Sequence, residues 1–196
     1  FRSVRARLAA DETVAVFGCG GVGLSAIMIA RALGAKVVAI DVSDAALESA
    51  REFGAARCVN ARGLSPEGLS AEVVAQFAMT DPDGVAVTVD ALGREDTIRA
   101  AIGALAPLGR HVQIGLLPAE PVVDLPRVIA LELSVLGSHG MAAAEYPELV
   151  DLVVQARLRP QDLVTNVIGL DEAPAAMEAM GSPAASAGMT IIDLAR

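Results

Sequence analysis

Residues 13–41, TVAVFGCGGVGLSAIMIARALGAKVVAID, decide the fold of this chain. Residues 14–17 form a short apolar run without a polar face, which is typical of a strand covered on both sides in a parallel sheet. Three glycines with the spacing GxGxxG follow directly, and residues 22–33 then predict a helix. A second apolar strand over residues 36–40 ends at Asp41. The stretch therefore predicts a strand, a glycine turn, a helix and a second strand.

The glycine turn and the acid after the second strand indicate a dinucleotide site. Gly18 makes the tight turn, Gly20 lets a diphosphate approach the backbone, and Gly23 lets helix and strand pack closely. The N–H groups and the positive dipole end of the helix face this turn, so the expected ligand is an anion. Asp41 lies about 20 residues beyond the turn, where a carboxylate accepts hydrogen bonds from the ribose hydroxyls and repels a 2′-phosphate. The alternative, that these glycines only form a turn, is disfavoured by the strand, helix and acid in register with them.

The alternation of apolar strands and helices continues after Asp41. We expect a helix capped by Asp44 over residues 44–53 and a helix capped by Ser70 over residues 70–79. Residues 121–126, PVVDLP, are apolar and bounded by prolines, which predicts a short extended edge strand. The other expected elements are strands over residues 57–60, 85–90, 109–115 and 133–137 and helices over residues 95–105 and 127–131. This order predicts an α/β fold with a doubly wound, six-stranded parallel Rossmann sheet.

The chain divides into three predicted parts. Residues 1–9 resemble the end of a linking helix begun upstream, residues 10–144 form the dinucleotide-binding Rossmann domain, and residues 145–196 form a C-terminal tail. In the tail we expect helices over residues 145–157 and 171–180 and a strand over residues 189–194. The tail is too short to be a domain. We therefore expect a small appendage that adds its elements to a partner domain formed by sequence upstream of this chain.

Composition narrows the class of protein. The net charge of the 196 residues is −9 and basic clusters are lacking, so nucleic acid is not an expected partner. No apolar run reaches membrane-spanning length and no signal peptide precedes the first strand, which predicts a soluble, cytoplasmic protein without membrane contact. Cys19 and Cys58 should lie on either side of the second strand, about 10 Å apart and beyond disulfide reach. Two small buried thiols are expected, and no metal site.

Six motifs, taken in order, resemble the cofactor-binding half of a zinc-dependent alcohol dehydrogenase of the medium-chain dehydrogenase/reductase family. They are VAVFGCGGVGL (14–24), AIDVS (39–43), FGA (53–55), VDALG (89–93), GRHVQIGL (109–116) and LGS (136–138). In the enzymes that this chain resembles, a preceding catalytic domain carries the zinc ligands and the proton relay and is completed by the C-terminal end of the chain, here residues 145–196. The resemblance implies hydride transfer between a small-molecule alcohol or aldehyde and NAD. It places zinc in the full-length enzyme only and no catalytic residue in this chain.

The resemblance also implies which residues meet the cofactor. The residues expected to frame the diphosphate are Gly18, Gly20, Gly21, Val22 and Gly23, with Asp41 at the adenosine ribose. The residues expected along the adenosine and the bridge are Ala91, Leu92 and Gly93, and those expected at the carboxamide are Ile114, Gly115, Leu116 and Ser138. Family members often carry a lysine where this chain has Ala46 and an arginine where it has Ile192. We therefore expect modest cofactor affinity, or another basic residue that compensates.

Three polar residues at or near strand ends have structural and functional interpretations. His111, inside the fifth strand, is expected to be packed or edge-exposed rather than a ligand. His139 follows the sixth strand at the nicotinamide end, where it is either an ordinary loop residue or a contact to substrate or cofactor. Asp90 is expected to be a structural acid at the end of the fourth strand.

Assembly and function each leave alternatives open. The resemblance implies a homodimer or tetramer in which residues 121–126 pair with their own copy across a two-fold axis, although the tail could cover this edge instead. A zinc-free quinone or enoyl reductase is a second candidate function, but such enzymes usually prefer the phosphorylated cofactor, which Asp41 disfavours. A noncatalytic nucleotide-sensing module is a third, because fold does not fix function.

Overall fold

A six-stranded parallel sheet forms the centre of the molecule. The computed structural model describes residues 8–180 and 188–195, so most of the predicted linking helix lies outside the described residues. The strand order is β3-β2-β1-β4-β5-β6, which is the doubly wound order, and every neighbouring pair is parallel. The strands are β1 (Thr13–Phe17), β2 (Lys36–Asp41), β3 (Arg57–Asn60), β4 (Val85–Asp90), β5 (Leu105–Gln113) and β6 (Ser134–Gly137). The predicted fold class is confirmed.

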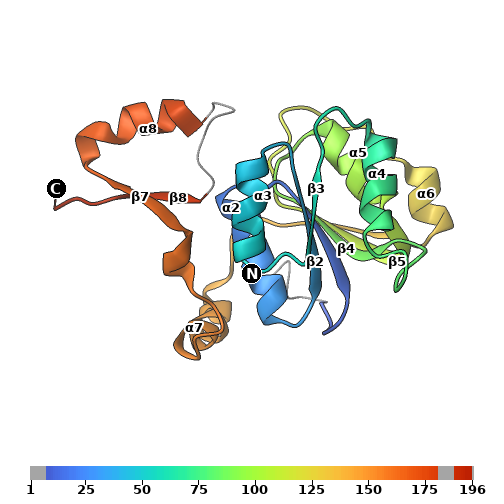
Figure 1. Ribbon diagram of the computed structural model, residues 1–196, viewed down its shortest axis with the longest axis horizontal. Coiled ribbons are helices and arrows are strands. Elements are labelled where there is room, and N and C mark those ends of the chain that lie inside the picture. The colour runs from blue at the N-terminus through green and yellow to red at the C-terminus, as the bar shows by residue number, and fades with distance from the viewer. Residues whose placement is uncertain (1–7, 181–187, 196) are drawn as a thin grey trace.

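Helices cover both faces of this sheet. Figure 1 shows α2 (Gly21–Ala32) and α3 (Asp44–Glu52) on one side, with α4 (Pro66–Ala75), α5 (Glu95–Gly103) and α6 (Leu125–Ala130) on the other. All five residues of β1 are buried, which explains why its sequence lacks a polar face. Alternate side chains of β1 enter two apolar clusters, with Val14 and Val16 on the α2 side and Ala15 and Phe17 on the other.

Serine caps, rather than the predicted residues, begin α3 and α4. Ser43 Oγ accepts a hydrogen bond from Ala46 N at 3.4 Å, so Asp44 is the first helical residue and not the cap. Ser65 Oγ accepts from Gly68 N at 3.1 Å, and Pro66 occupies the first turn of α4, where its missing N–H costs nothing. Ser70 is therefore inside α4. Its hydroxyl donates to Ala100 O of α5 at 2.9 Å and ties the two helices together.

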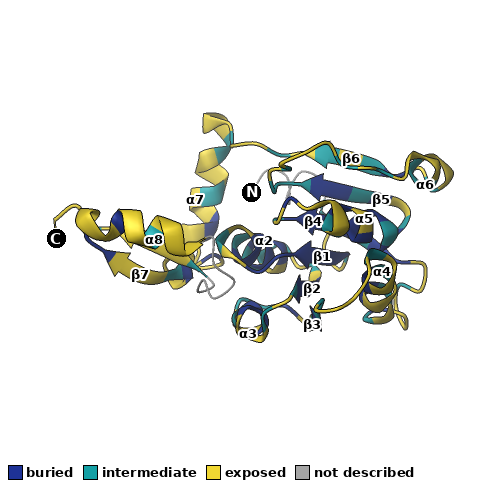
Figure 2. Cartoon of the chain, turned by 90° about the horizontal axis from the view of Figure 1, so that it is seen from above, coloured by how far each residue is buried: buried dark blue, intermediate teal, exposed yellow. Residues whose placement is uncertain are grey.

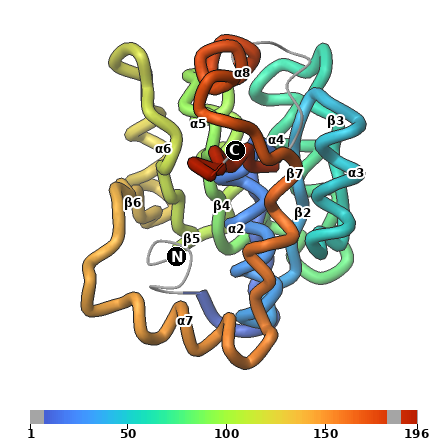
Figure 3. The backbone as a smooth tube through the Cα atoms, turned by 90° about the vertical axis from the view of Figure 1, so that its left-hand side faces the viewer, coloured from blue at the N-terminus to red at the C-terminus, as the bar shows by residue number. Residues whose placement is uncertain are grey.

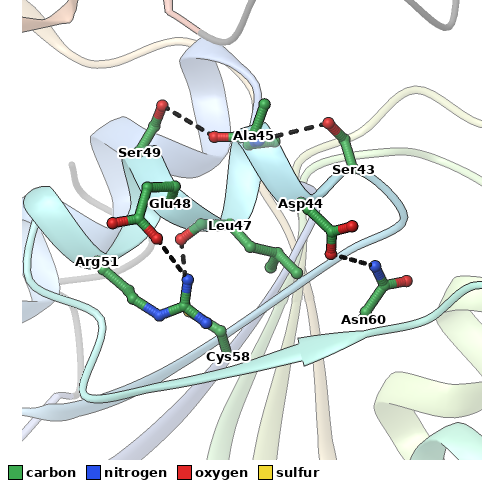
Figure 4. A network of polar contacts seen from close by, with 10 residues as sticks. Ser43, Asp44, Ala45, Leu47, Glu48, Ser49, Arg51, Cys58 and Asn60 are labelled. Atoms are coloured by element: carbon green, nitrogen blue, oxygen red, sulfur yellow. Dashed lines mark hydrogen bonds and ion pairs between the residues drawn. The ribbon is translucent and has the colours of Figure 1, made fainter.

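Polar contacts fasten α3 to β3 directly after the acid of β2. Asn60 Nδ2 donates to Asp44 Oδ1 at 2.6 Å, and the Cys58 thiol donates to Leu47 O at 3.5 Å (Figure 4). On the exposed side of α3, Arg51 pairs with Glu48 at 2.7 Å. These contacts fix the position at which the chain leaves β2 and enters α3, and that position adjoins the glycine turn.

The start of β5 differs from its predicted start. β5 begins at Leu105, not Gly109, and its register against β4 shifts between Val85 and Val87. Pro107 lacks an N–H, and Leu108 has a φ of 62° with its N–H donating to Leu131 O at 2.8 Å, so the chain bulges outward here before it resumes pairing. The second half of β5, which leads to the predicted site, follows the prediction.

The predicted edge strand at residues 121–126 is wrong within the single chain. Residues 121–124 carry no strand assignment, and Leu125 and Pro126 belong to α6. The Asp124 side chain caps α6 by accepting from Arg127 N at 3.0 Å, and the proline suits the first turn of a helix. Arg127 in turn donates to the carbonyls of Gly103 and Leu105 at 2.9 and 3.2 Å, which joins α6 to the end of α5.

The chain after β6 forms a second, smaller unit. It contains α7 (Tyr146–Val154), β7 (Val164–Ile168), α8 (Ala173–Met180) and β8 (Met189–Ile192), with β7 and β8 paired in parallel. Figure 3 shows the path from β6 through α7 to β7, and Figure 2 shows that α8 and β7 are mostly exposed, unlike β1. β7 was not predicted. Leu152, Leu158 and Leu163 are buried in the same cluster as α2, which anchors the start of this unit to the main sheet.

Candidate functional site

The glycine turn lies between β1 and α2 and is closed by backbone contacts. Gly18 has a φ of 93° and its N–H donates to Ile40 O at 2.8 Å. A Cβ atom at Gly23 would lie 1.7 Å from Gly18 O, so this position requires glycine. A Cβ atom at Gly20 would meet nothing within 4 Å, which leaves open space above the turn. The turn is thus tight on its inner side and accessible on its outer side.

The start of α2 presents backbone donors to that space. Gly20 is the N-cap residue without a side-chain hydrogen bond, and the first turn contains no acidic residue. At this end of the helix, Leu24 N donates to Gly20 O at 2.8 Å. N–H groups at a helix start, together with the helix dipole, favour an anion. Val22 is half-exposed here, and the backbone of Gly188 and the side chain of Met189 border Gly21 from the tail.

The Asp41 carboxylate joins the end of β2 to the glycine turn. Its Oδ2 accepts from Cys19 N at 2.8 Å and its Oδ1 from Ser43 N at 2.9 Å. The two oxygens of a carboxylate offer about four acceptor positions, so two such bonds leave further capacity for hydroxyl donors. The acid is therefore oriented before any ligand arrives.

A pocket of about 320 Å³ opens beside Asp41. Its size lies at the lower end of the roughly 300–1,000 Å³ typical of small-molecule sites, and its lining combines apolar side chains with a few polar ones. The lining includes Ile40, Asp41, Val42, Ala61, Leu64, Pro66, Leu69, Leu92, Arg94, Asp96 and Thr97. A larger hollow of about 1020 Å³ lies between α4, α5 and residues 122–127, away from the glycine turn. The smaller pocket is the one that adjoins the predicted site.

Several residues of this pocket were not identified from the sequence. Leu64 and Leu69 come from the loop and helix after β3, and no spacing rule connects them to the glycine turn. Arg94 lies in the lining and forms an ion pair with Asp96 at 2.9 Å. Arg62 donates to Val42 O, next to Asp41, at 2.8 Å. Arg62 and Arg94 are thus two basic residues near the acid, whereas Ala46 is buried and Ile192 lies in β8.

The loops after β4 and β5 touch each other through their backbones. Asp90 O accepts from Ile114 N and Gly115 N, both at 2.9 Å. A Cβ atom at Gly115 would lie 2.2 Å from Gly93 N, so only glycine permits this approach. The fully buried Asp90 side chain accepts from Leu92 N and Gly93 N at 2.7 and 3.0 Å, as expected of a structural strand-end acid. Residues 91–93 and 114–116 therefore form one edge of the site.

The end of β6 lies beside this edge. Ser138 N donates to Gln113 O at 2.9 Å, which places Ser138 next to the loop after β5. His139 is exposed and lies in the loop after β6. His111 is fully buried, as the packed interpretation predicted, between Thr88 Oγ1 at 2.9 Å and Gln113 Oε1 at 3.1 Å. Burial lowers the pKa of His111.

Both cysteines are free thiols. Cys19 is buried, and burial, together with the nearby Asp41 charge, raises the pKa of its thiol. Cys58 is only partly buried, so the expectation of two buried thiols is correct for Cys19 alone. Among residues 8–180 and 188–195, no group of three or more His, Cys, Asp or Glu side chains could hold a metal ion. Within the described residues, we find no helix with the length and hydropathy of a membrane span.

Comparisons with known proteins place this geometry in a family. A family model described as zinc-binding dehydrogenase matches residues 21–155. The chain is 32% identical over 178 residues to a probable D-xylulose reductase A of Aspergillus clavatus, which covers 89% of this chain and 48% of the relative. An alcohol dehydrogenase of Aeropyrum pernix superposes with a TM-score of 0.81 at 29% identity, over 98% of this chain and 54% of that one. A structure described as an NAD-dependent alcohol dehydrogenase gives a TM-score of 0.84 at 25% identity, over 98% and 55%.

The fold and the arrangement of its strand ends define a Rossmann-type α/β protein. The family model that matches residues 21–155 then identifies the family within this fold class. The chain belongs to the zinc-binding dehydrogenase family, and the predicted membership of the medium-chain dehydrogenase/reductases is confirmed. It spans about half the length of the relatives that it matches.

Proposed function

We propose that this chain binds NAD and forms the cofactor-binding part of an NAD-dependent, zinc-type dehydrogenase that acts on a small alcohol, polyol or aldehyde. The observation that carries the proposal is Asp41, held by Cys19 N and Ser43 N at the mouth of a pocket beside the glycine turn. An acid at this place accepts from two ribose hydroxyls and repels a 2′-phosphate. The D-xylulose reductase and alcohol dehydrogenase relatives support a polyol or alcohol substrate.

Each part of the proposed cofactor has a matching surface. The diphosphate would lie at the start of α2, against Gly18, Gly20, Gly21, Val22 and Gly23. Its negative charge would balance the positive end of the helix dipole. The apolar lining of the pocket would hold the adenine, with Ala91, Leu92 and Gly93 alongside. The backbone at Ile114, Gly115, Leu116 and Ser138 would hold the carboxamide. When bound, NAD supplies the hydride acceptor, and these residues orient it and exclude water from one side.

The remaining parts of the enzyme are proposed to lie outside this chain. We assign no catalytic residue and no zinc ligand to these 196 residues. We propose that residues 145–196 contribute to a catalytic domain, because much of their apolar surface, including Met177, Ile191 and Ile192, is exposed. A cytoplasmic location is proposed as well, since the free thiols suit a reducing compartment.

The assembly is proposed to be a homodimer or tetramer. Residues 121–124 are not paired with any described strand, and Val122 is exposed. Val123 O accepts from Leu125 N at 2.9 Å, and we propose that other backbone groups of this segment pair with a second copy across a two-fold axis.

The experiment that tests the proposed function is a calorimetric comparison of NADH with NADPH. Measurable binding with preference for NADH supports it, whereas preference for NADPH would favour the zinc-free reductase alternative.

A further inference from the structure

A line of buried polar groups runs along β5 toward the loop after it. Thr88 and His111 are direct partners across β4 and β5, and both are fully buried. Thr88 Oγ1 lies 2.9 Å from His111 Nδ1, and His111 Nε2 lies 3.1 Å from Gln113 Oε1. The Gln113 amide Nε2 then donates to Gly115 O at 2.8 Å. A polar line in an apolar layer is costly unless every member is paired, so packing alone does not explain it.

The contact of Gln113 with Gly115 O decides which group donates and which accepts in each hydrogen bond of this line. Because Gln113 donates its NH₂ to Gly115 O, its own Oε1 faces His111 and accepts. His111 Nε2 must then carry the proton, and Nδ1 accepts from the Thr88 hydroxyl. The donors therefore all point toward the loop after β5. A neutral imidazole satisfies both neighbours, in agreement with the lowered pKa that burial causes at His111.

The contact to Gly115 O fixes the orientation of one peptide group. In a trans peptide the C=O and the following N–H point in opposite directions. Holding Gly115 O toward Gln113 therefore turns Leu116 N–H away from Gln113, and Leu116 as a whole is 82% exposed. Glycine permits many backbone conformations, so this peptide would otherwise turn over easily. The loop start is anchored separately, by the bonds from Ile114 N and Gly115 N to Asp90 O.

We infer that Gln113, supported by His111 and Thr88, is a positioning residue for the nicotinamide end of the cofactor, because it locks the Gly115–Leu116 peptide with its N–H toward the bound carboxamide. The inference rests on the proposed function, in which the backbone of residues 114–116 holds the carboxamide. Both ends of the Gln113 amide are engaged within the protein, by His111 Nε2 and by Gly115 O, so its proposed role is to hold the peptide and not to contact the ligand. Its effect should therefore appear with the whole dinucleotide and not with a ligand that lacks nicotinamide.

Two substitutions at Gln113 distinguish this role from a purely structural one. Gln113→Ala removes the donor to Gly115 O and lets the peptide turn. Gln113→Glu is closer in shape and still accepts from His111, but its carboxylate repels Gly115 O and attracts Leu116 N–H, so it should favour the turned peptide. NADH affinity should therefore fall in the order unaltered chain, Gln113→Ala, Gln113→Glu. A purely structural role predicts the opposite order, in which Gln113→Glu, the closer match to glutamine in shape, weakens NADH binding less than Gln113→Ala.

The test is calorimetric titration of the full chain with NADH and with ADP-ribose, which carries the adenosine, diphosphate and second ribose but no nicotinamide. We expect Gln113→Ala to weaken NADH binding about three- to tenfold, the range of one hydrogen bond, and Gln113→Glu to weaken it more. ADP-ribose affinity should stay within about twofold for both. Gln76→Ala, which removes an amide that donates to Glu72 on α4 at 2.8 Å, is the matched control and should change neither affinity.

The titrations distinguish a failure of the positioning role of Gln113 from a failure of the proposed NAD binding. Equal losses for NADH and ADP-ribose, or a smaller effect of glutamate than of alanine, would overturn the positioning role. If the unaltered chain bound neither ligand, the proposed function would fail, and the inference with it.

Discussion

The Asp41 carboxylate accepts a hydrogen bond from the backbone N–H of Cys19 at 2.8 Å, across 22 residues of sequence. This bond connects the acid at the end of β2 to the middle of the glycine turn. As a consequence, Asp41, which we propose binds the ribose, and the glycine turn, which we propose holds the diphosphate, form one rigid unit. Substitutions on either side of the bond should therefore affect the other.

Gly23→Ala should destabilise the fold, whereas Gly20→Ala should not. A Cβ atom at Gly23 would lie 1.7 Å from Gly18 O, while at Gly20 it would meet nothing within 4 Å. We expect Gly23→Ala to lower the free energy of unfolding by about 1–3 kcal/mol, as in other overpacked sites. Gly20→Ala should keep the stability and weaken NADH binding, because its methyl group occupies the space of the diphosphate. Urea unfolding and calorimetry measure both, and equal stability of the two variants would contradict the close-packed turn.

Acid should destabilise the protein in part through Glu12. Burial raises the pKa of Glu12, but the Arg110 guanidinium, at 3.0 and 2.7 Å, and the hydrogen bond from Ala9 N outweigh burial, so the net effect is a lowered pKa. A carboxyl with a depressed folded pKa stabilises the protein above its unfolded pKa and loses that contribution as pH falls through the folded value. Glu12→Gln should cost about 1–2 kcal/mol near pH 7 and flatten the stability curve below pH 4.5. Glu48→Gln, in the exposed pair with Arg51, is the control and should cost no more than about 0.5 kcal/mol. An unchanged acid slope in Glu12→Gln would refute the assignment.

The purified chain should contain no stoichiometric zinc and oxidise no alcohol. Its two cysteines are separate free thiols, and the described residues contain no cluster of metal-binding side chains. A zinc site needs three or four ligands held together. Elemental analysis and an assay with NAD and short alcohols test this. One equivalent of bound zinc, or turnover, would show that the catalytic parts are assigned to the wrong residues.

Val123→Pro should dissociate a dimer that pairs through residues 121–124. Proline removes the N–H of residue 123, which a second copy would need for strand pairing. Sedimentation at micromolar concentration measures the assembly, and thermal unfolding checks that the variant is still folded. A monomeric unaltered chain, or a dimer that survives the substitution, counts against this interface.

The sequence predicted the parts of the fold that are dictated by local apolar patterns. β1, β2 and β4 match their predicted bounds to within one residue, because strands buried on both faces leave nearly unbroken apolar runs. The bounds of β3 match as well, although only Val59 of this strand is buried. The prediction of secondary structure failed where two features of the sequence indicated different elements. In residues 121–126 the prolines suggested strand ends, but Asp124 and Pro126 together begin a helix. β7 was missed because its Thr165 and Asn166 are exposed, so it lacks the apolar signature of the main sheet.

The residues of the candidate site also fall into those that sequence motifs predict and those that depend on tertiary packing. The glycines and Asp41 follow from spacing, because a local turn and a strand end set their positions. The pocket lining of Leu64, Leu69 and Arg94 depends on how α4 and α5 pack over the sheet, which no short motif encodes. The contact of Gln113 with Gly115 is local in sequence but depends on a side-chain orientation that His111 sets from the interior.

The central claim, that Asp41 selects NAD, is tested most directly by titrating the unaltered chain and Asp41→Asn with NADH and NADPH. Asparagine keeps the shape but loses the charge, at a site where two charge-assisted hydrogen bonds of roughly 1.5–3 kcal/mol each are at stake. We predict that the unaltered chain binds NADH at least about tenfold more tightly than NADPH, a difference of about 1.4 kcal/mol. Asp41→Asn should weaken NADH and narrow or invert the ratio. Tighter binding of NADPH to the unaltered chain, or a ratio unchanged by Asp41→Asn, would contradict the claim.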